Sequence, residues 1–434
     1  MKRRLLLGLA AVLGATAVVL GGGGRSDDAA ARSAGDEHLA ALVAQFSSGS
    51  SADVVRELEA AAAATPEDSR AQALLGLGYQ QLFRETARPE YLSRARNSLE
   101  VAAELDAADF TTEIGLAQIS ATQHRFRSAE EHARRALRLE PGNVAALGTL
   151  GDALLELGRY DAAFQAYDRA AAVGPSVGAY ARVARARELL GRSDGALDAL
   201  ELAVEAGSGI SEQKAWALMR YGGVLLSVGR TADAREAFRR SLALQPAFPH
   251  ARAGLARVAT ANGDRKSAIR SFEQLLRTAP SAEYATELGD LYLAAGDEQR
   301  ANRAYEQARA FEHDLAKHGV RTMLASASLD LDRGLRLRSA LDRAWRAYRE
   351  APNVETEDVL AWALARNGRC VEARAWSERS LELGRGDATI LFHRGMIERC
   401  LGNPSARGWF AAAIAADPGF SVRWAPLALR LSRS

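Results

Sequence analysis

Apolar residues recur every three or four positions along most of the chain, the spacing that buries one face of an α-helix. The clearest stretch places Leu147, Leu150 and Leu154 on one face, and Gly158 follows before a second apolar pattern begins. A glycine at such a point can end one helix and let the chain turn into the next. The pattern therefore predicts pairs of helices joined by short turns.

These turn glycines recur at nearly constant spacing. The successive intervals are 33, 38, 34, 33, 38, 34 and 34 residues for Gly158, Gly191, Gly229, Gly263, Gly296, Gly334, Gly368 and Gly402. A fixed period of this size is typical of arrays of helical repeats. The two intervals of 38 predict an extra helical turn or a longer loop near 207–213 and near 313–319.

Two further markers stay in phase with the glycines. Prolines recur about 17 residues after a turn position, where the second helix must stop because proline cannot continue it: Pro141, Pro175, Pro246, Pro280 and Pro352. Side-chain oxygens just beyond five turns are predicted to cap the second helix: Asp161, Ser193, Thr231, Asp264 and Asp297.

Small and aromatic residues complete the repeating unit. The best-defined unit contains Leu150, Gly151, Tyr160, Ala163, Tyr167, Ala170 and Pro175. This order resembles the tetratricopeptide repeat (TPR) family, whose units carry a Leu-Gly pair, an aromatic residue, two alanines, another aromatic residue and a closing proline. The resemblance covers about 71–420 and blurs at 177–214 and 320–353. It implies an all-α fold, a right-handed α-solenoid of about ten helix-turn-helix units.

The N-terminal 24 residues have a different composition. Three basic residues precede an uncharged apolar run over 5–24, the pattern of an export signal peptide or of an N-terminal membrane anchor. Cleavage and retention both stay open. The positive flank is expected to remain cytoplasmic, which places the rest outside. We therefore expect a periplasmic, extracellular or membrane-anchored protein that contacts the membrane only through residues 5–24 if these are retained.

The remaining segments follow from the repeat frame. The predicted organisation is a linker over 25–36, a degenerate helical unit over 37–70 with a first helix at 38–46, the solenoid over 71–420, and a C-terminal cap or tail over 421–434. A cap is expected because the last unit of a solenoid otherwise exposes an apolar face.

Composition narrows the fold and the partners. The 90 alanines favour helix, and with 48% hydrophobic residues they exclude an all-β fold and wholesale disorder. The 56 basic and 54 acidic residues leave a net charge of +2, so no chain-wide positive field attracts nucleic acid. We therefore expect no nucleic-acid partner, whereas the resemblance to the TPR family implies protein or peptide partners.

Motifs for catalysis or cofactor binding are not apparent. Gly21–Gly24 is followed by arginine and serine rather than by the lysine of a phosphate-binding loop. His313 and His318 are five residues apart, which places them on different sides of a helix. We therefore expect no catalytic, cofactor or metal site. An enzyme with an unrecognised site in 177–214 or 320–353 remains an alternative.

The two cysteines allow one specific hypothesis. Cys370 falls at the start of a second helix and Cys400 near the end of the next first helix. In stacked antiparallel helices these levels coincide, and a disulfide is permitted outside the cytoplasm. The alternative is two buried, inert thiols.

The resemblance also implies a binding surface, because in this family the first helices line the concave face. The family positions that contact ligands correspond to Gln72, Tyr79, Gln118, Asp152, Arg185, Glu188, Trp216, Met219, Arg257, Asp290 and Trp362. They do not reproduce the clamp that holds peptide carboxylates in the chaperone-binding members. Trp216, Met219 and Trp362 are either apolar anchors for a partner or core residues, and the core interpretation is favoured.

These observations predict a non-catalytic scaffold that binds protein or peptide partners in an extracytoplasmic compartment. The alternative is a ligand-sensing or regulatory subunit of an envelope polysaccharide-export or secretion assembly. Both rest on what the fold class implies rather than on a recognised site.

Overall fold

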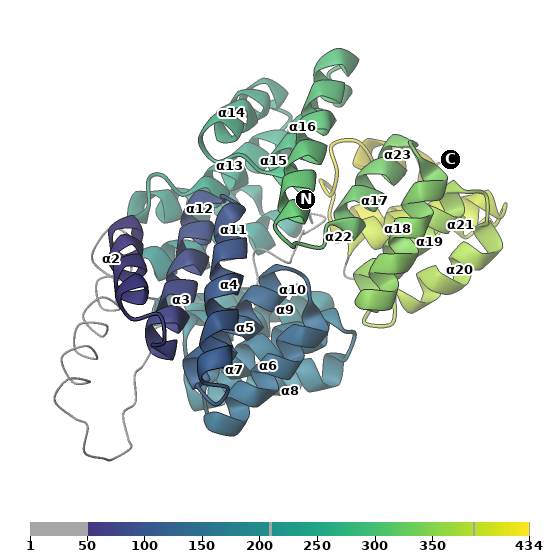
Figure 1. The fold of residues 1–434 in the computed structure, drawn as a ribbon. Helices are drawn as coiled ribbons and strands as arrows, with labels where there is room; N and C mark the ends of the chain where they lie inside the picture. Colours follow the sequence, from purple (N-terminus) through teal and green to yellow (C-terminus); the bar gives the residue numbers. More distant parts are fainter. Residues whose placement is uncertain (1–50, 208–210, 385–386, 434) are drawn as a thin grey trace.

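A computed structural model describes residues 51–207, 211–384 and 387–433. Within these ranges the chain forms 22 helices and no strand, and the helices follow a continuous path from α2 to α23 (Figure 1). The prediction of an all-α solenoid is confirmed. The predicted signal or anchor, the linker and the helix at 38–46 lie outside the described residues. No helix within the described ranges combines the length and apolar character needed to cross a bilayer.

Ten helix pairs make up the solenoid, flanked by α2 (Ser51–Ala64) and α23 (Ala425–Leu431). The first helices are α3 (Ser69–Thr86), α5 (Phe110–Thr122), α7 (Val144–Glu156), α9 (Val177–Leu189), α11 (Ser211–Ser227), α13 (Pro249–Ala261), α15 (Ala282–Ala294), α17 (Met323–Arg333), α19 (Val354–Arg366) and α21 (Ala388–Cys400). The second helices are α4 (Glu90–Leu105), α6 (Phe126–Leu139), α8 (Tyr160–Val173), α10 (Ser193–Ala206), α12 (Thr231–Leu244), α14 (Arg265–Thr278), α16 (Glu298–Lys317), α18 (Leu337–Glu350), α20 (Cys370–Arg379) and α22 (Ala406–Ala416).

The turns explain the glycine period. All eight phased glycines have φ between 69° and 80°, a left-handed conformation that glycine adopts without a steric penalty. The capping prediction is confirmed at Asp264 and Asp297, whose side chains accept backbone N–H groups of α14 and α16. It is wrong at Asp161, Ser193 and Thr231. The cap is the residue directly after the turn glycine, and in those three turns that residue is an arginine without a side-chain cap.

Within a pair, a glycine of the first helix lies against an aromatic ring of the second. A Cβ at Gly151 would be 2.5 Å from the ring of Tyr167, and one at Gly289 would be 2.6 Å from that of Tyr305. Both rings are almost fully buried. Only glycine leaves room for this contact, so the helices of a pair approach closely.

The two longer intervals are lengthened helices. α11 has 17 residues and α16 has 20, against 13 or 14 in most other helices of the array. The end of α16 does not pack only on its neighbours in sequence. Leu315 and Val320 join the apolar cluster formed by α2 to α5. The insertion therefore brings the middle of the chain against its beginning.

The solenoid closes on itself at this point. The side chain of Gln123, after α5, donates to the carbonyl oxygen of His318 over 3.1 Å, and the amide of Arg321 donates to the carbonyl of Gln123 over 3.1 Å. His124 contacts the carbonyl of Arg321 at 2.8 Å. The side-chain contacts of Gln123 and His124 join residues that are 195 and 197 positions apart in the sequence.

A second closure contact lies beside the first. The hydroxyl of Tyr160 at the start of α8 accepts the amide of Val354 over 2.7 Å, and Asn353 donates to the carbonyl of Glu156 over 2.9 Å. A Cβ at Gly158 would collide with the carbonyl oxygen of Pro352. The turn between α7 and α8 therefore packs directly against the turn between α18 and α19.

Cys370 and Cys400 form a disulfide in this structure, with their Cα atoms 6.2 Å apart. The bridge joins the start of α20 to the end of α21 and closes a loop of 30 residues. It ties the last two complete repeat units together.

Replacing both cysteines with serine is expected to lower the free energy of unfolding by about 3–4 kcal/mol, because the bridge restricts the unfolded chain. Thermal or urea unfolding of the full chain measures this. The wild-type protein under reductant is the matched control and should approach the double variant. Equal stability of the double variant and the oxidised wild type would contradict the prediction.

The C-terminal segment covers the last unit. Phe420, Ala425 and Ala428 are buried in a cluster with Phe392 of α21 and Phe410 of α22. The segment leading into α23 also returns toward the middle of the chain, because Val422 packs against the cluster formed by α13 to α17.

Candidate functional site

A large cavity lies inside the closed solenoid, lined by residues of the described part of the chain. It holds about 1720 Å³ of space, including open solvent at its mouth. Its walls come mainly from the first helices α15 and α17 and from residues 420–424. Smaller contributions come from the α5–α6 turn, α13, α16, α18 and α19. The inner face of the superhelix and the closure contacts therefore build this cavity together.

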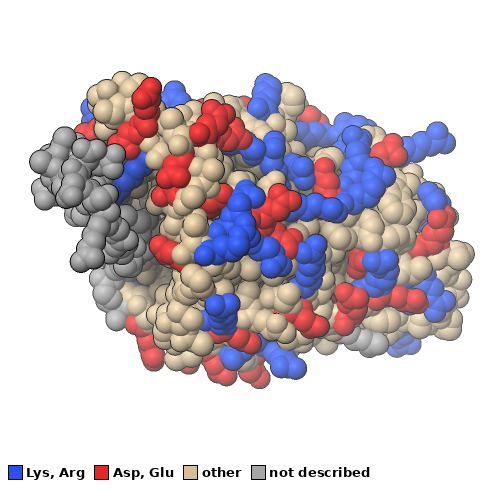
Figure 2. Space-filling model, turned by 60° about the horizontal axis from the view of Figure 1, so that its bottom comes forward, with Lys and Arg blue, Asp and Glu red and all other residues tan. Residues whose placement is uncertain are grey.

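Acidic side chains dominate its charged lining. The lining contains eight carboxyl groups and three arginines. The carboxyl groups are those of Glu156, Glu283, Glu287, Asp290, Glu312, Asp332, Glu350 and Glu355, and the arginines are Arg321, Arg333 and Arg423. The outer face shown in Figure 2 differs, because Lys and Arg side chains are interspersed there with Asp and Glu. The acidic excess distinguishes the cavity lining from the face that Figure 2 shows.

Two cavity carboxyls meet across the closure. Burial raises the pKa of Glu355 to about 8, and the nearby Glu156 adds to the effect. Burial also raises the pKa of Glu156 to about 7, although Arg185 opposes it. Glu156 accepts a hydrogen bond from Asn353 over 3.1 Å. The side chain of Glu355 has no hydrogen bond or ion pair within the described ranges.

The α15 wall carries a second acidic group. Arg257, only 4% exposed, reaches from α13 and pairs with Glu283 at 2.9 Å and with Glu287 at 2.8 Å. Burial nevertheless raises the pKa of Glu287 to about 7, because desolvation outweighs the attraction of the guanidinium. Two carboxyls sharing one arginine leave this wall with an acidic excess.

Glu312 is the most enclosed of the cavity carboxyls with a raised pKa. It lies on the lengthened helix α16, is 6% exposed, and its Oε2 atom has no hydrogen-bond partner. Burial raises its pKa to about 8, and the charge of Asp330 contributes. A buried carboxyl without a partner is costly to ionise and favours an incoming donor.

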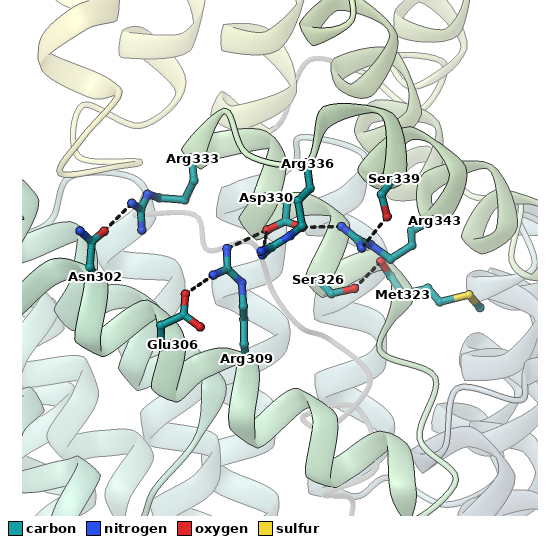
Figure 3. Close-up of polar contacts among 10 residues, drawn as sticks. All are labelled: Asn302, Glu306, Arg309, Met323, Ser326, Asp330, Arg333, Arg336, Ser339 and Arg343. Atoms are coloured by element: carbon teal, nitrogen blue, oxygen red, sulfur yellow. Dashed lines mark hydrogen bonds and ion pairs between the residues drawn. The ribbon is translucent and has the colours of Figure 1, made fainter.

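An ionic cluster around Asp330 joins α16, α17 and the start of α18 (Figure 3). Asp330 of α17 is 2% exposed and accepts hydrogen bonds from Arg309 of α16 at 2.8 Å, and from Arg336 at 2.6 Å and Arg343 at 2.5 Å on the α18 side. Burial acts to raise the pKa of Asp330, but the bonds from Arg336 and Arg309 outweigh it and the pKa is lowered. The cluster fixes α16, α17 and α18 around the cavity wall.

His124 contributes a neutral group at the closure. Its Nδ1 atom faces the carbonyl of Arg321 and must donate to it, since a carbonyl oxygen only accepts. Burial lowers the pKa of His124, so the ring is neutral near pH 7. Its Nε2 is a buried acceptor without a partner.

The structure places most of the predicted binding residues inside helix packing. Asp152 pairs with Arg182 and accepts the hydroxyl of Tyr167, and Asp290 accepts that of Tyr305. The buried members are Tyr79, Gln118, Asp152, Trp216, Met219, Arg257 and Trp362, and Gln72, Arg185, Glu188 and Asp290 are partly exposed. Of this set only Asp290 lines the cavity.

The aromatic candidates are core residues here. Trp362 is 2% exposed, stacks on His393 with ring centroids 4.5 Å apart, and donates to Asp332 over 3.2 Å. Trp216 and Met219 belong to the cluster of α9 to α13. No ligand role of any of these residues is tested, so that role stays a prediction.

Repeat-position reasoning missed Glu312, Glu355 and Glu287. Glu312 lies in the inserted part of α16, for which the repeat frame has no equivalent position. Glu355 is in the first turn of α19, just after the blurred stretch 320–353. The only sequence signal was the interval of 38 residues, which marked the insertion without indicating its role.

The raised pKa values predict that stability decreases as the pH rises. Unfolded glutamate loses its proton near pH 4.3, whereas the folded Glu312 keeps it until about pH 8. The stability of such a group is fully present below the unfolded pKa and is lost as the pH rises through the folded pKa. The expected slope is about 1.4 kcal/mol per pH unit for each group between these limits.

Glu312→Gln is expected to flatten this slope and to be more stable than the wild type at about pH 9. Urea unfolding at a series of pH values measures both. An unchanged slope in the variant would show that the carboxyl is ionised in the folded protein at neutral pH.

Comparison with known proteins identifies the repeats. Models of the tetratricopeptide repeat match residues 114–177 and 225–291. The chain contains tetratricopeptide repeats. Its repeats have the Leu-Gly pair and the aromatic residues in the positions that the structure shows in contact.

Solved structures with similar helical arrays are distant in sequence. A TPR protein from Parabacteroides merdae is 17% identical and matches 56% of this chain and 97% of its own, with a TM-score of 0.42. PilF from Pseudomonas aeruginosa is 21% identical over 50% of this chain and 96% of its own, with a TM-score of 0.37. Human IFIT1 is 14% identical and matches 88% of this chain and 90% of its own, with a TM-score of 0.47. No curated protein sequence matches this chain.

Proposed function

We propose that this protein is a non-catalytic TPR scaffold that holds a segment of a protein or peptide partner inside its closed solenoid. The cavity supports this proposal. Its walls combine several first helices with the closure contacts and residues 420–424. Ligand sites are concave and lined by apolar side chains with a few polar groups, and this cavity has such a lining.

The non-catalytic part of the proposal rests on the arrangement of the polar groups. A nucleophile needs an adjacent base that a third group orients. The cavity histidine, His124, instead uses Nδ1 to hold the carbonyl of Arg321. The blurred stretch 320–353 does reach the cavity, through Arg321 and the first turns of α17, and its side chains there serve the wall and the closure.

We further propose an extracytoplasmic setting, either free after cleavage or anchored by the N-terminal segment. The basic and apolar residues of 1–24 support it, and the disulfide is compatible with it. A role as the ligand-sensing subunit of an envelope export or secretion assembly is the second candidate. The closure favours it, because a ligand that separates the two regions would change the shape of the whole solenoid.

Crosslinking and purification from intact cells test the proposal. A tryptophan at Thr286 on α15 fills part of the cavity, and a tryptophan at Val371, which is 77% exposed on α20, is the matched control. Thr286→Trp should lose the partners that Val371→Trp retains. Identical partners for both variants would refute binding in the cavity.

Deleting residues 1–36 tests the location separately. The full chain should be found outside the cytoplasm and the shortened chain inside it. A cytoplasmic location of both forms would contradict the export part of the proposal.

A further inference from the structure

The arginines and the carboxyl groups that line the cavity differ in how far other groups of the protein already bind them. Of its three lining arginines, Arg321 pairs with Glu350 at 3.3 Å, and Arg333 bonds Asn302 at 2.7 Å while lying over the ring of Tyr305. Arg423 lies 4.2 Å from the ring centre of Trp424. The Nη1 atom of Arg423 has no hydrogen-bond partner. Two of the three positive groups are thus already engaged in polar contacts with the protein.

The carboxyl groups are not all engaged. Glu312 is 94% removed from solvent and its Oε2 atom has no partner, although the side chain lines the cavity. Glu355 of α19 also lines the cavity, and its side chain forms no hydrogen bond or ion pair with any described residue. The Nε2 atom of His124 has no partner and can only accept a hydrogen bond, which adds a third acceptor. All three sites call for a donor.

We propose that the cavity binds a cationic segment, an extended peptide whose arginine or lysine side chains donate to Glu312 and Glu355. This inference rests on the proposed function, since it specifies the chemistry of the partner in the same cavity. A guanidinium or ammonium group supplies several donors and a positive charge, and its hydrogen bonds to carboxylates are the strong, charge-assisted kind. Backbone amides and hydroxyls supply no such charge.

Binding of a cation in this cavity must also release protons. The carboxyl of Glu312 faces Asp330, Arg309 and Arg343, and its burial keeps it protonated near pH 7. Glu355 is likewise held neutral by burial and faces Glu156, Asp358 and Asp387, with Arg185 opposing them. An arriving guanidinium stabilises the carboxylates, so the protons leave to the solvent. Affinity therefore rises with pH through the range in which these groups titrate.

Titration calorimetry of the full chain tests the inference. The probe is an end-blocked peptide of alternating glycine and arginine. Peptides with citrulline or with glutamate in place of arginine are the controls, because citrulline keeps the shape of arginine without its charge. Repeating the titration in buffers of different ionisation enthalpy counts the protons released.

The arginine peptide is expected to bind with net proton release, and the citrulline peptide to bind more weakly by about tenfold or more. The double variant E312Q/E355Q should lose that difference while remaining folded, because glutamine keeps the shape and removes only the ionisation. Glu236→Gln on the exposed face of α12 is the matched control and should bind as the wild type does. Equal binding of the citrulline or glutamate peptide, or unchanged binding by E312Q/E355Q, would overturn the inference.

These outcomes are separate from those of the proposed function. If Thr286→Trp abolishes capture of the partner while the charge of the peptide makes no difference, the cavity binds a segment that is not selected for positive charge. If Thr286→Trp has no effect on the partner, the proposed function itself fails.

Discussion

Replacing Gly158 with alanine is expected to lower the free energy of unfolding by about 2–5 kcal/mol. The residue has φ of 71°, and a left-handed conformation costs about 1–2 kcal/mol for a residue with a Cβ. The new Cβ would also collide with the carbonyl oxygen of Pro352, and overpacking adds about 1–3 kcal/mol. Relief of that collision would pull apart the contact of Tyr160 with Val354. Urea unfolding followed by tryptophan fluorescence measures the loss.

Gly263 provides the matched control. Its φ is 80°, but an added Cβ there would meet no atom within 4 Å. Gly263→Ala should therefore cost only the conformational part, about 1–2 kcal/mol. The difference between the two variants reports on the closure of the solenoid. Equal losses would mean that the α7–α8 turn does not pack against the α18–α19 turn in solution.

Replacing Asp330 with alanine is expected to cost about 3–5 kcal/mol, because it leaves Arg309 and Arg343 buried or half-buried without their carboxylate. The same unfolding experiment measures it. Asp233→Ala on α12 breaks an exposed pair with Arg230 and should cost about 1 kcal/mol or less.

The pH dependence of this loss has a defined sign. The folded pKa of Asp330 is lowered, so its stabilising contribution is present above the unfolded pKa of about 3.9 and disappears as the pH falls through the folded value. The wild type and Asp330→Ala should therefore converge in stability under strongly acidic conditions. A constant difference down to low pH would contradict the ionic origin of the effect.

The repeat and its internal packing were predictable from the sequence. The glycine period predicted the turns, and the Leu-Gly pair and the aromatic positions predicted the repeat. The contact of Gly151 with the ring of Tyr167 within one pair is evident only in the structure. These features are local, because each depends on residues within one repeat. The capping prediction failed at Asp161 for a local reason as well, since the turn places its cap directly after the glycine.

The closure and the cavity were not predictable in this way. Gln123 and His318 lie 195 positions apart, and their contact depends on the small rotation between every pair of successive units. Sequence periodicity does not contain that rotation. Glu312 and Glu355 line the same cavity only because the successive rotations curve the array of helices. Glu312 also has no counterpart in other repeats, because it lies in the inserted turn of α16.

Site-specific photocrosslinking tests the central claim, that the interior of the closed solenoid is the binding site. A photoreactive residue is placed at Thr286 in the cavity wall or, as a control, at Val371 on the exposed surface of α20. The full chain is then irradiated in intact cells. The account predicts a defined crosslinked partner from position 286 and none from position 371. A partner captured only from position 371 would contradict it.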